Sequence, residues 1–196
     1  APPAPQPAPQ PATPPAPQPA TPPSDGAAVE APAASSRLPR CPVRERVPTG
    51  WIVALGVAGD VLTIPRRGSG GCTLTRLAPG VSPVSVDLAP DRRHVAIGTT
   101  SQGEPAIIET TVAQAGRFRE VARPATSPTF APDGRLAYTE LAYGLDITFK
   151  RAIVVRDATG RERARIAYPE WSIVSGPPAE EAAAWSPDGR RLVLVE

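Results

Sequence analysis

A short pattern occurs three times in this chain of 196 residues and constrains its fold more than any other feature. The three copies are VDLAPDRRHVAIG from Val86, PTFAPDGRLAYT from Pro128 and AAWSPDGRRLVLV from Ala183. Each copy has a large apolar residue, a small residue, the step Pro-Asp and then alternating apolar residues. Because side chains along a strand point alternately to its two faces, the alternation predicts a half-buried β-strand after each Pro-Asp step. The apolar residues expected on one face are Val95 and Ile97, Leu136 and Tyr138, and Leu192 and Leu194.

The Pro-Asp steps themselves predict tight turns between strands. Proline presets φ near −65°, aspartate accepts hydrogen bonds from nearby backbone, and glycine takes the positive φ that closes a hairpin. The first copy departs from the pattern because Arg92 stands where glycine is expected. A metal-binding or acid–base role for the aspartates is disfavoured, since each turn has one carboxylate and no acidic neighbour. The turn residues assigned a structural role are Asp91, Pro132, Asp133, Gly134, Pro187, Asp188 and Gly189.

The rest of the chain after residue 48 consists of short apolar runs separated by Gly, Pro, Asp and Ser, which is typical of strands. The turn aspartates lie 42 and 55 residues apart, and a period of about 40 to 45 residues with four strands is typical of a β-propeller blade. The longer spacing is expected to hold loop insertions. The predicted strands are Trp51–Leu55, Val61–Ile64, Thr73–Leu77, Val84–Leu88, His94–Thr99, Ala106–Val112, Phe118–Val121, Leu136–Glu140, Ala152–Arg156, Arg163–Tyr168 and Arg191–Val195.

The segments FAPDGRLAY and WSPDGRRLVLV resemble the W/F-S-P-D-G-x-x-[ILV]-A-[FY] signature of the TolB-like branch of WD-repeat-like propellers. The resemblance covers about Cys72–Glu196. It implies a binding scaffold, often outside the cytoplasm, although similar propellers also precede the hydrolase domain of prolyl-oligopeptidase-like enzymes. We therefore expect an all-β fold, an incomplete β-propeller of about three blades. Closed propellers have four to eight blades, so we expect further blades beyond Glu196.

The first part of the chain has a different composition, because 16 of its 28 prolines precede Thr49. A tract of Pro, Ala, Gln and Thr has no residue large enough to build a core and favours the polyproline II conformation. We expect residues 1–48 to form a disordered linker and lead-in, and residues 49–196 the partial propeller. A spacer is favoured over a docking peptide, and an anchor upstream of Ala1 is a hypothesis. The four arginines between Arg37 and Val47 are read as a solvated lead-in rather than a patch for anionic surfaces.

Composition also excludes several kinds of site. One His and two Cys are too few for a metal cage of those residues, and we expect neither a metal nor a cofactor. A net charge of +2 would not concentrate a polyanion, so nucleic acid is not an expected partner. The longest apolar run, Trp51–Leu55, is far shorter than the ~20 residues that span a bilayer.

Cys41 and Cys72 are the only two cysteines in the chain. Two cysteines with none left over indicate one disulfide in an oxidising compartment, with two reduced thiols as the alternative. The disulfide would join the lead-in to the first blade. It would also agree with an extracytoplasmic location, whether periplasmic, secreted or at the cell surface.

No residue is predicted to be catalytic. Ser69 lies in the stretch Gly-Ser-Gly-Gly, which resembles the serine context of chymotrypsin-like proteases, but Gly68 stands where those have Asp. In those proteases the His also precedes the Ser, whereas His94, the sole histidine, follows Ser69, so a flexible hairpin loop is favoured. Tyr143 and Trp171 lie in the expected loop insertions and are the candidate partner-binding residues. The expected function is a non-enzymatic, extracytoplasmic module that binds a protein or a small ligand and is tethered by a proline-rich spacer. The alternatives are the propeller part of a larger enzyme, such as a prolyl-oligopeptidase-like peptidase, and the sensor domain of a membrane receptor kinase.

Overall fold

The computed structural model describes residues 38–56, 59–143, 148–167, 171–172 and 182–195. The chain divides into two compact units, residues 1–36 and residues 37–196, and all elements described below belong to the second unit. The proline-rich tract precedes residue 38 and lies outside the described residues. No helix in the described part of the chain is long and apolar enough to cross a membrane.

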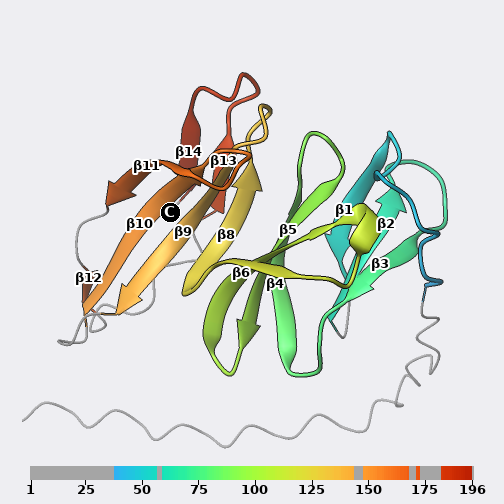
Figure 1. The fold of residues 1–196 in the computed structure, drawn as a ribbon, viewed down its shortest axis with the longest axis horizontal. Coiled ribbons are helices and arrows are strands. Elements are labelled where there is room, and N and C mark those ends of the chain that lie inside the picture. The colour runs from blue at the N-terminus through green and yellow to red at the C-terminus, as the bar shows by residue number, and fades with distance from the viewer. Residues whose placement is uncertain (1–37, 57–58, 144–147, 168–170, 173–181, 196) are drawn as a thin grey trace, which may run out of the picture. The chain divides into compact units, whose positions relative to one another are not determined.

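The regular secondary structure of the described residues is almost entirely β-strand (Figure 1). One short 3-10 helix, η2 (Val112–Gln114), follows β6, and Thr111 caps it by accepting a hydrogen bond from the Gln114 backbone N–H. The strands are β1 (Trp51–Leu55), β2 (Asp60–Pro65), β3 (Cys72–Arg76), β4 (Val81–Leu88), β5 (His94–Ser101), β6 (Glu104–Thr111), β7 (Arg119–Ala122), β8 (Ala125–Phe130), β9 (Leu136–Tyr143), β10 (Thr148–Arg156), β11 (Glu162–Ala167), β12 (Trp171–Ser172), β13 (Ala182–Trp185) and β14 (Leu192–Val195).

The strands form four antiparallel sheets in which neighbours in the chain pair with each other. Sheet 1 is β1-β2-β3, sheet 2 is β4-β5-β6-β7, sheet 3 is β8-β9-β10-β11 with β12 added beside β10, and sheet 4 is β13-β14. A four-stranded up-and-down sheet is the unit of a propeller blade, and sheets 2 and 3 have this form. The expected fold class, an incomplete propeller-like all-β fold, is confirmed.

Three strands were missing from the sequence-based prediction, namely β8, β12 and β13. Pro128 and Ser127 interrupt β8, where the pairing with β9 shifts register between Thr126 and Thr129. A proline cannot donate a ladder hydrogen bond, so its presence weakened the strand pattern there. Strand β13 is Ala-Ala-Ala-Trp, and alanine has low strand propensity. Pairing with β14 nevertheless makes this segment a strand.

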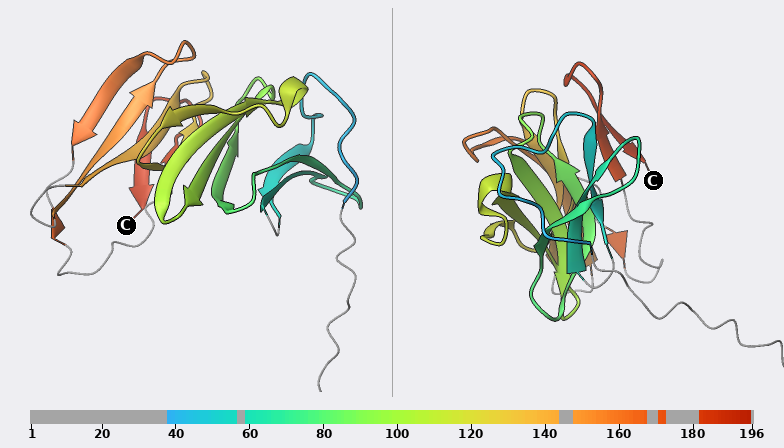
Figure 2. Two further views of the ribbon diagram at one scale, coloured as in Figure 1. Left: turned by 60° about the horizontal axis from the view of Figure 1, so that its bottom comes forward. Right: turned by 90° about the vertical axis from the view of Figure 1, so that its right-hand side faces the viewer.

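The hydrophobic core lies between consecutive sheets, and sheet 2 lies between sheets 1 and 3 (Figure 2). In β5 the pair Val95 and Ile97 packs in a cluster with sheet 1, whereas Ala96, on the opposite face, packs with sheet 3. In β9 the pair Leu136 and Tyr138 packs with sheet 2. The apolar pair of each of these two repeats thus faces the preceding sheet. Leu192, at the same position in the last repeat, packs against a cluster in sheet 3.

The lead-in to sheet 1 is part of the folded unit. Cys41 and Cys72 form a disulfide with their Cα atoms 4.8 Å apart, which confirms the predicted pairing. Arg40 forms a parallel bridge with Thr73 of β3, and the side chain of Val47 is 1% exposed in the core between sheets 1 and 2. The lead-in therefore packs against the outer strand of the first sheet.

Candidate functional site

The three Pro-Asp turns have one geometry and one position in the fold. Each joins the first strand of a sheet to the second, in sheets 2, 3 and 4. In each turn a carbonyl accepts a hydrogen bond from the N–H three residues later, because the chain reverses within four residues. These bonds run to Ala89 from Arg92 (2.8 Å), to Ala131 from Gly134 (2.9 Å) and to Ser186 from Gly189 (2.8 Å).

The turn aspartates bind backbone rather than a ligand. One carboxylate oxygen of Asp91, Asp133 and Asp188 accepts from the N–H two residues later, at 2.7, 3.2 and 3.0 Å respectively. Burial opposes ionisation of Asp91 and Asp133, but these backbone hydrogen bonds, together with the side chains of His94 and Arg135, outweigh it and lower the pKa of both carboxyls. The Ser186 hydroxyl is the main cause of the lowered pKa of Asp188. All three side chains are therefore anionic acceptors near neutral pH.

Arg92 adopts the backbone conformation that glycine adopts in the other two turns. Its φ is 58°, compared with 88° for Gly134 and 68° for Gly189. A non-glycine residue in this left-handed region is strained by about 1–2 kcal/mol. The Arg92 side chain hydrogen-bonds the Thr49 hydroxyl, and its carbonyl accepts from the Val47 N–H at 2.9 Å. The departure from Asp-Gly thus keeps the turn and adds one side-chain contact, to Thr49.

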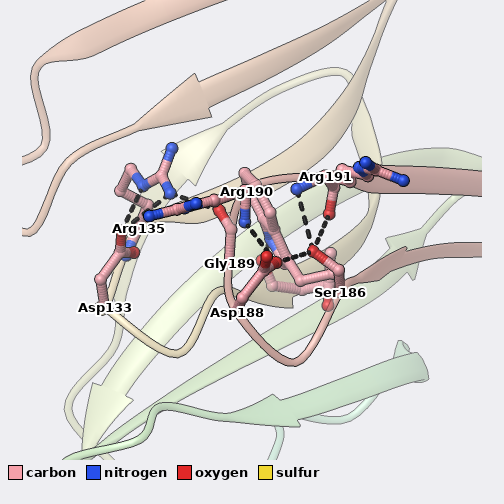
Figure 3. Close-up of polar contacts among 9 residues, drawn as sticks. Asp133, Arg135, Ser186, Asp188, Gly189, Arg190 and Arg191 are labelled. Carbon is pink, nitrogen blue, oxygen red and sulfur yellow. Dashed lines mark hydrogen bonds and ion pairs between the residues drawn. The ribbon is translucent and has the colours of Figure 1, made fainter.

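Arg135 joins the turn of sheet 3 to the turn of sheet 4 (Figure 3). Its Nε donates to Asp133 Oδ2 at 2.8 Å, and its Nη2 donates to the carbonyl of Gly189 at 2.6 Å. The guanidinium carbon also lies 4.9 Å from the centre of the Trp185 ring, within cation–π range. Trp185 in turn donates from Nε1 to the Thr129 carbonyl at 3.2 Å. The side chain of Arg135 therefore fixes two neighbouring turns relative to each other.

Asp87 plays the equivalent part between sheets 2 and 3. Its Oδ1 accepts from the Leu88 N–H at 2.9 Å, and its Oδ2 accepts from the Phe130 N–H at 2.6 Å. Burial raises the pKa of this carboxyl, and the hydrogen bonds offset only part of the rise. A half-buried carboxylate in β4 thus holds the end of β8 in place.

A groove of about 370 Å³ opens where the turns of sheets 2 and 3 meet. We call it the rim groove. Its walls combine apolar side chains, including Phe130 and Leu136, with ionisable ones. The residues that line it are Ala89, Pro90, Asp91, His94, Glu109, Arg119, Val121, Phe130, Pro132, Asp133, Gly134, Leu136, Arg156, Asp157, Ala158 and Gly160.

Most charges in the rim groove are paired. His94 Nδ1 lies 2.7 Å from Asp91 Oδ2, and Arg119 Nη2 lies 2.5 Å from Glu109 Oε2. The Thr159 hydroxyl is the main cause that lowers the pKa of Asp157 to about 2, and Arg163 contributes to the same shift. Paired, preorganised charges of this kind orient a polar ligand without having to rearrange.

Arg156 is the exception among these groups. Its Nη1 donates to the Val121 carbonyl at 2.9 Å, and its guanidinium lies 5.4 Å from the centre of the Tyr138 ring. In the described part of the chain, its buried Nε has no hydrogen-bond acceptor. An unmade hydrogen bond on a buried donor costs free energy. Because that Nε is buried, the part of Arg156 that a ligand in the rim groove can meet is the rest of its guanidinium, which is permanently charged.

Ser69 is not among the described residues that line this groove, whereas His94 is. Among the described residues, no hydrogen bond joins Ser69 to His94, whose ring nitrogen contacts Asp91 instead. Tyr143 and Trp171 both lie beside Phe149 in the strand register of sheet 3, at the end of β9 and in β12. Their side chains, like most of the two insertions, lie outside the described residues. No group of three or more His, Cys, Asp or Glu that could hold a metal is present in the described ranges.

Sequence reasoning missed the rim groove because its residues come from six strands and three turns. One local signal was present: Asp157-Ala-Thr-Gly160 forms a turn between β10 and β11 with a 2.9 Å hydrogen bond from Gly160 N–H to the Asp157 carbonyl. Its Asp and Gly are typical turn residues, but they do not follow the Pro-Asp pattern. The partners Glu109 and Arg119 carry no signal at all in the sequence.

Comparisons with known proteins leave the family open. No family model matches the chain, and no curated protein matches it. Among solved structures, the chain is similar to puromycin hydrolase, with 19% sequence identity and a TM-score of 0.42. The match covers 74% of this chain and 27% of the hydrolase chain, so this chain spans about a quarter of that protein. The similarity is too distant to transfer an activity or a substrate.

Proposed function

We propose that this chain is a non-enzymatic, extracytoplasmic binding module of the propeller type, tethered by its proline-rich segment. The observation that supports a binding role is the rim groove, which is built from turns on a scaffold of linked sheets. Binding residues are commonly held on loops that a rigid scaffold positions, and mixed apolar and polar walls are typical of ligand sites.

The links between the sheets supply the rigidity that this role needs. The Asp87 carboxylate binds the Phe130 N–H across sheets 2 and 3, and Arg135 binds the Gly189 carbonyl across sheets 3 and 4. Because both links lie beside the turns, the walls of the rim groove are held before any ligand arrives. Preorganisation reduces the entropy lost on binding.

The proposed location is supported by the disulfide between Cys41 and Cys72. Disulfides persist in oxidising compartments and are rare in the cytosol. The test is a fusion of the protein, expressed from its own gene, to alkaline phosphatase, which is active only after export. We expect an active fusion and no free thiol in protein alkylated at lysis. An inactive fusion with both thiols alkylated would overturn the location.

The binding role is tested by site-specific photo-crosslinking in living cells of the source. A photoreactive residue replaces exposed Pro132 at the rim groove, and a matched control replaces exposed Ser82, which lies toward the opposite end of β4. We expect a discrete crosslinked species from position 132 that is lost when Arg156→Ala is added, and none from position 82. Equal crosslinking from both positions, or no dependence on Arg156, contradicts a site in the rim groove.

The non-enzymatic part of the proposal has its own measurement. The purified chain is incubated with aminoacyl and peptidyl p-nitroanilides, which report hydrolase activity by absorbance. We expect no turnover above a heat-denatured sample. Turnover that is abolished by Ser69→Ala or His94→Ala would replace the binding module with a hydrolase.

A further inference from the structure

A second groove, of about 700 Å³, lies between the lead-in, β3 and the loop that contains η2. We call it the arginine groove, because its ionisable lining residues are all arginines. Among the described residues it shares no lining residue with the rim groove. The residues that line it are Leu38, Arg40, Cys41, Pro42, Val43, Thr73, Leu74, Thr75, Arg76, Val112, Ala113, Ala115, Gly116 and Arg117.

The charged side chains that line the arginine groove are all positive. Arg76 is neutralised by Asp60, with hydrogen bonds of 2.6 and 3.1 Å from its Nε and Nη2. In the part of the chain that the structure describes, no carboxylate pairs with Arg40 or Arg117. The chain as a whole is nearly balanced, with 21 basic and 19 acidic residues, so this excess is local.

A smaller neighbouring pocket adds two more arginines, on either side of Glu45, which pairs with Arg93 at 3.6 Å. It is lined by Arg44 and Arg46 and shares Cys41, Pro42, Leu74 and Val112 with the arginine groove. None of its lining residues is acidic. Arginines that are far apart in the sequence, from the lead-in to the loop after η2, therefore surround one region of the surface. Such a concentration of one charge raises the local concentration of an oppositely charged partner.

The walls of the arginine groove are held in place without a ligand. The Cys41–Cys72 disulfide joins the lead-in covalently to the start of β3. The Cys41 N–H donates to the Thr73 carbonyl at 2.9 Å, and the Thr73 hydroxyl donates to the Leu38 carbonyl at 3.3 Å. The arginines of the lead-in are therefore presented by a fixed backbone, which reduces the ordering cost of binding.

The lining indicates which kind of anion fits. Apolar side chains line the groove together with the arginines, and one of them, Val43, is 91% exposed. A phosphate polymer would pair with the guanidinium groups but would leave this apolar surface in water. A peptide with both carboxylate and apolar side chains would match both, because guanidinium binds carboxylate through two parallel hydrogen bonds.

We propose that the arginine groove binds an acidic peptide segment of a protein partner, with carboxylates on Arg40 and Arg117 and apolar side chains against Val43 and Leu74. A volume of about 700 Å³ is within the range of sites that enclose a ligand of drug size, which corresponds to a few peptide residues. This inference goes beyond the proposed function of the rim groove and does not depend on it.

The test is fluorescence anisotropy with the full chain and a fluorescein-labelled peptide that alternates glutamate and leucine. We expect saturable binding that weakens as salt is raised, because exposed charges are screened. Arg40→Ala and Arg117→Ala are each expected to raise Kd by about threefold to tenfold, the range for charge-assisted contacts at a partly exposed site. Arg156→Ala in the rim groove is expected to leave Kd unchanged, which separates this proposal from the previous one.

Matched controls distinguish the groove from general attraction to arginine. Arg190→Ala removes an exposed arginine in the turn of sheet 4, whose side chain has no carboxylate partner among the described residues, and is expected to leave Kd unchanged. A peptide with lysine in place of glutamate is expected not to bind, and one with serine in place of leucine is expected to bind more weakly. Thermal unfolding of each variant is compared with the wild type. If Arg40→Ala unfolds early, Arg117→Glu in the loop after η2 carries the test alone.

Three results would overturn the proposal. The first is equal binding of the glutamate and lysine peptides. The second is a Kd that Arg190→Ala changes as much as Arg117→Ala does. The third is tighter binding of inorganic polyphosphate, or of vesicles of phosphatidylglycerol and phosphatidylcholine, with the same dependence on Arg117, which would identify a phosphate ligand instead of a peptide.

Discussion

Asp87 provides the sharpest test of how the sheets are held together. Replacing it with alanine removes the acceptors of two backbone N–H groups, those of Leu88 in its own strand and Phe130 in sheet 3. An orphaned, partly buried N–H costs about 1–3 kcal/mol. Burying this charge is itself unfavourable, as the raised pKa of Asp87 indicates, so removing the carboxylate offsets part of that loss of stability. We therefore expect Asp87→Ala to lower the free energy of unfolding by about 2 kcal/mol, roughly a thirtyfold change in the folded-to-unfolded ratio.

The assay is urea unfolding of the full chain, followed by tryptophan fluorescence. The matched control is Glu104→Ala, which removes an exposed carboxylate paired with Arg123 at 3.2 Å and is expected to cost less than about 1 kcal/mol. If Asp87→Ala and Glu104→Ala unfold at the same urea concentration, the carboxylate does not hold sheets 2 and 3 together. In that case the rigidity of this part of the fold comes from other contacts.

The same residue predicts the sign of a pH effect. The folded-state pKa of Asp87 is raised above the ordinary value of 3.8, so the part of its contribution that depends on protonation is fully present below pH 3.8 and is lost as the pH rises through the raised value, while its hydrogen bonds to the two N–H groups remain. Asp87→Asn keeps one side-chain acceptor but does not titrate. We expect the wild type to lose stability relative to Asp87→Asn as the pH rises through this window. A relative gain over that window would refute the reasoning.

Three further predictions concern the disulfide and the turns. Replacing both Cys41 and Cys72 by serine is expected to lower the free energy of unfolding by roughly 3.5 to 4 kcal/mol, because the unfolded chain regains the entropy that the closed loop removes. A loss below about 1 kcal/mol in urea unfolding would contradict this. Gly134→Ala is expected to lower the free energy of unfolding by about 1–2 kcal/mol in calorimetry because its φ of 88° strains a non-glycine residue; an added Cβ meets no atom within 4 Å, so no clash adds to this cost. Arg92→Gly is expected to be neutral or stabilising, and equal losses in both variants would contradict the shared turn geometry. The pKa of Asp157 is lowered to about 2, so its contribution to stability is present above pH 3.8 and is lost as the pH falls toward 2. Asp157→Asn is therefore expected to destabilise the chain at neutral pH and to match the wild type below pH 2. An acid-unfolding curve that Asp157→Asn leaves unchanged would contradict this.

Local sequence signals predicted the strands and turns well where one residue type decides the backbone. The Pro-Asp steps produced tight turns in three consecutive sheets, and the alternation after each step placed Val95 and Ile97 in the core. The same reasoning failed for β8 and β13, because pairing with a neighbouring strand overrode a proline in one and a run of alanines in the other. Strand propensity is a weak guide where a pairing partner is already in place.

What the sequence determined by itself was therefore local: the turn chemistry, the faces of the strands and the class of fold. These follow from the backbone preferences of proline and glycine and from the two-residue period of a strand, which need no distant partner. Because Cys41 and Cys72 are the two cysteines of the chain, the sequence left two possibilities, one disulfide between them or two reduced thiols.

Only the tertiary structure decided which distant groups meet. The Asp87 carboxylate reaches Phe130 across 43 positions of the chain, and Arg135 reaches Gly189 across 54. The arginines of the lead-in and of the loop after η2 form one groove for the same reason. Hydrogen bonding, burial and the local field at a side chain depend on whatever segment packs against it, and that packing is a property of the whole folded chain.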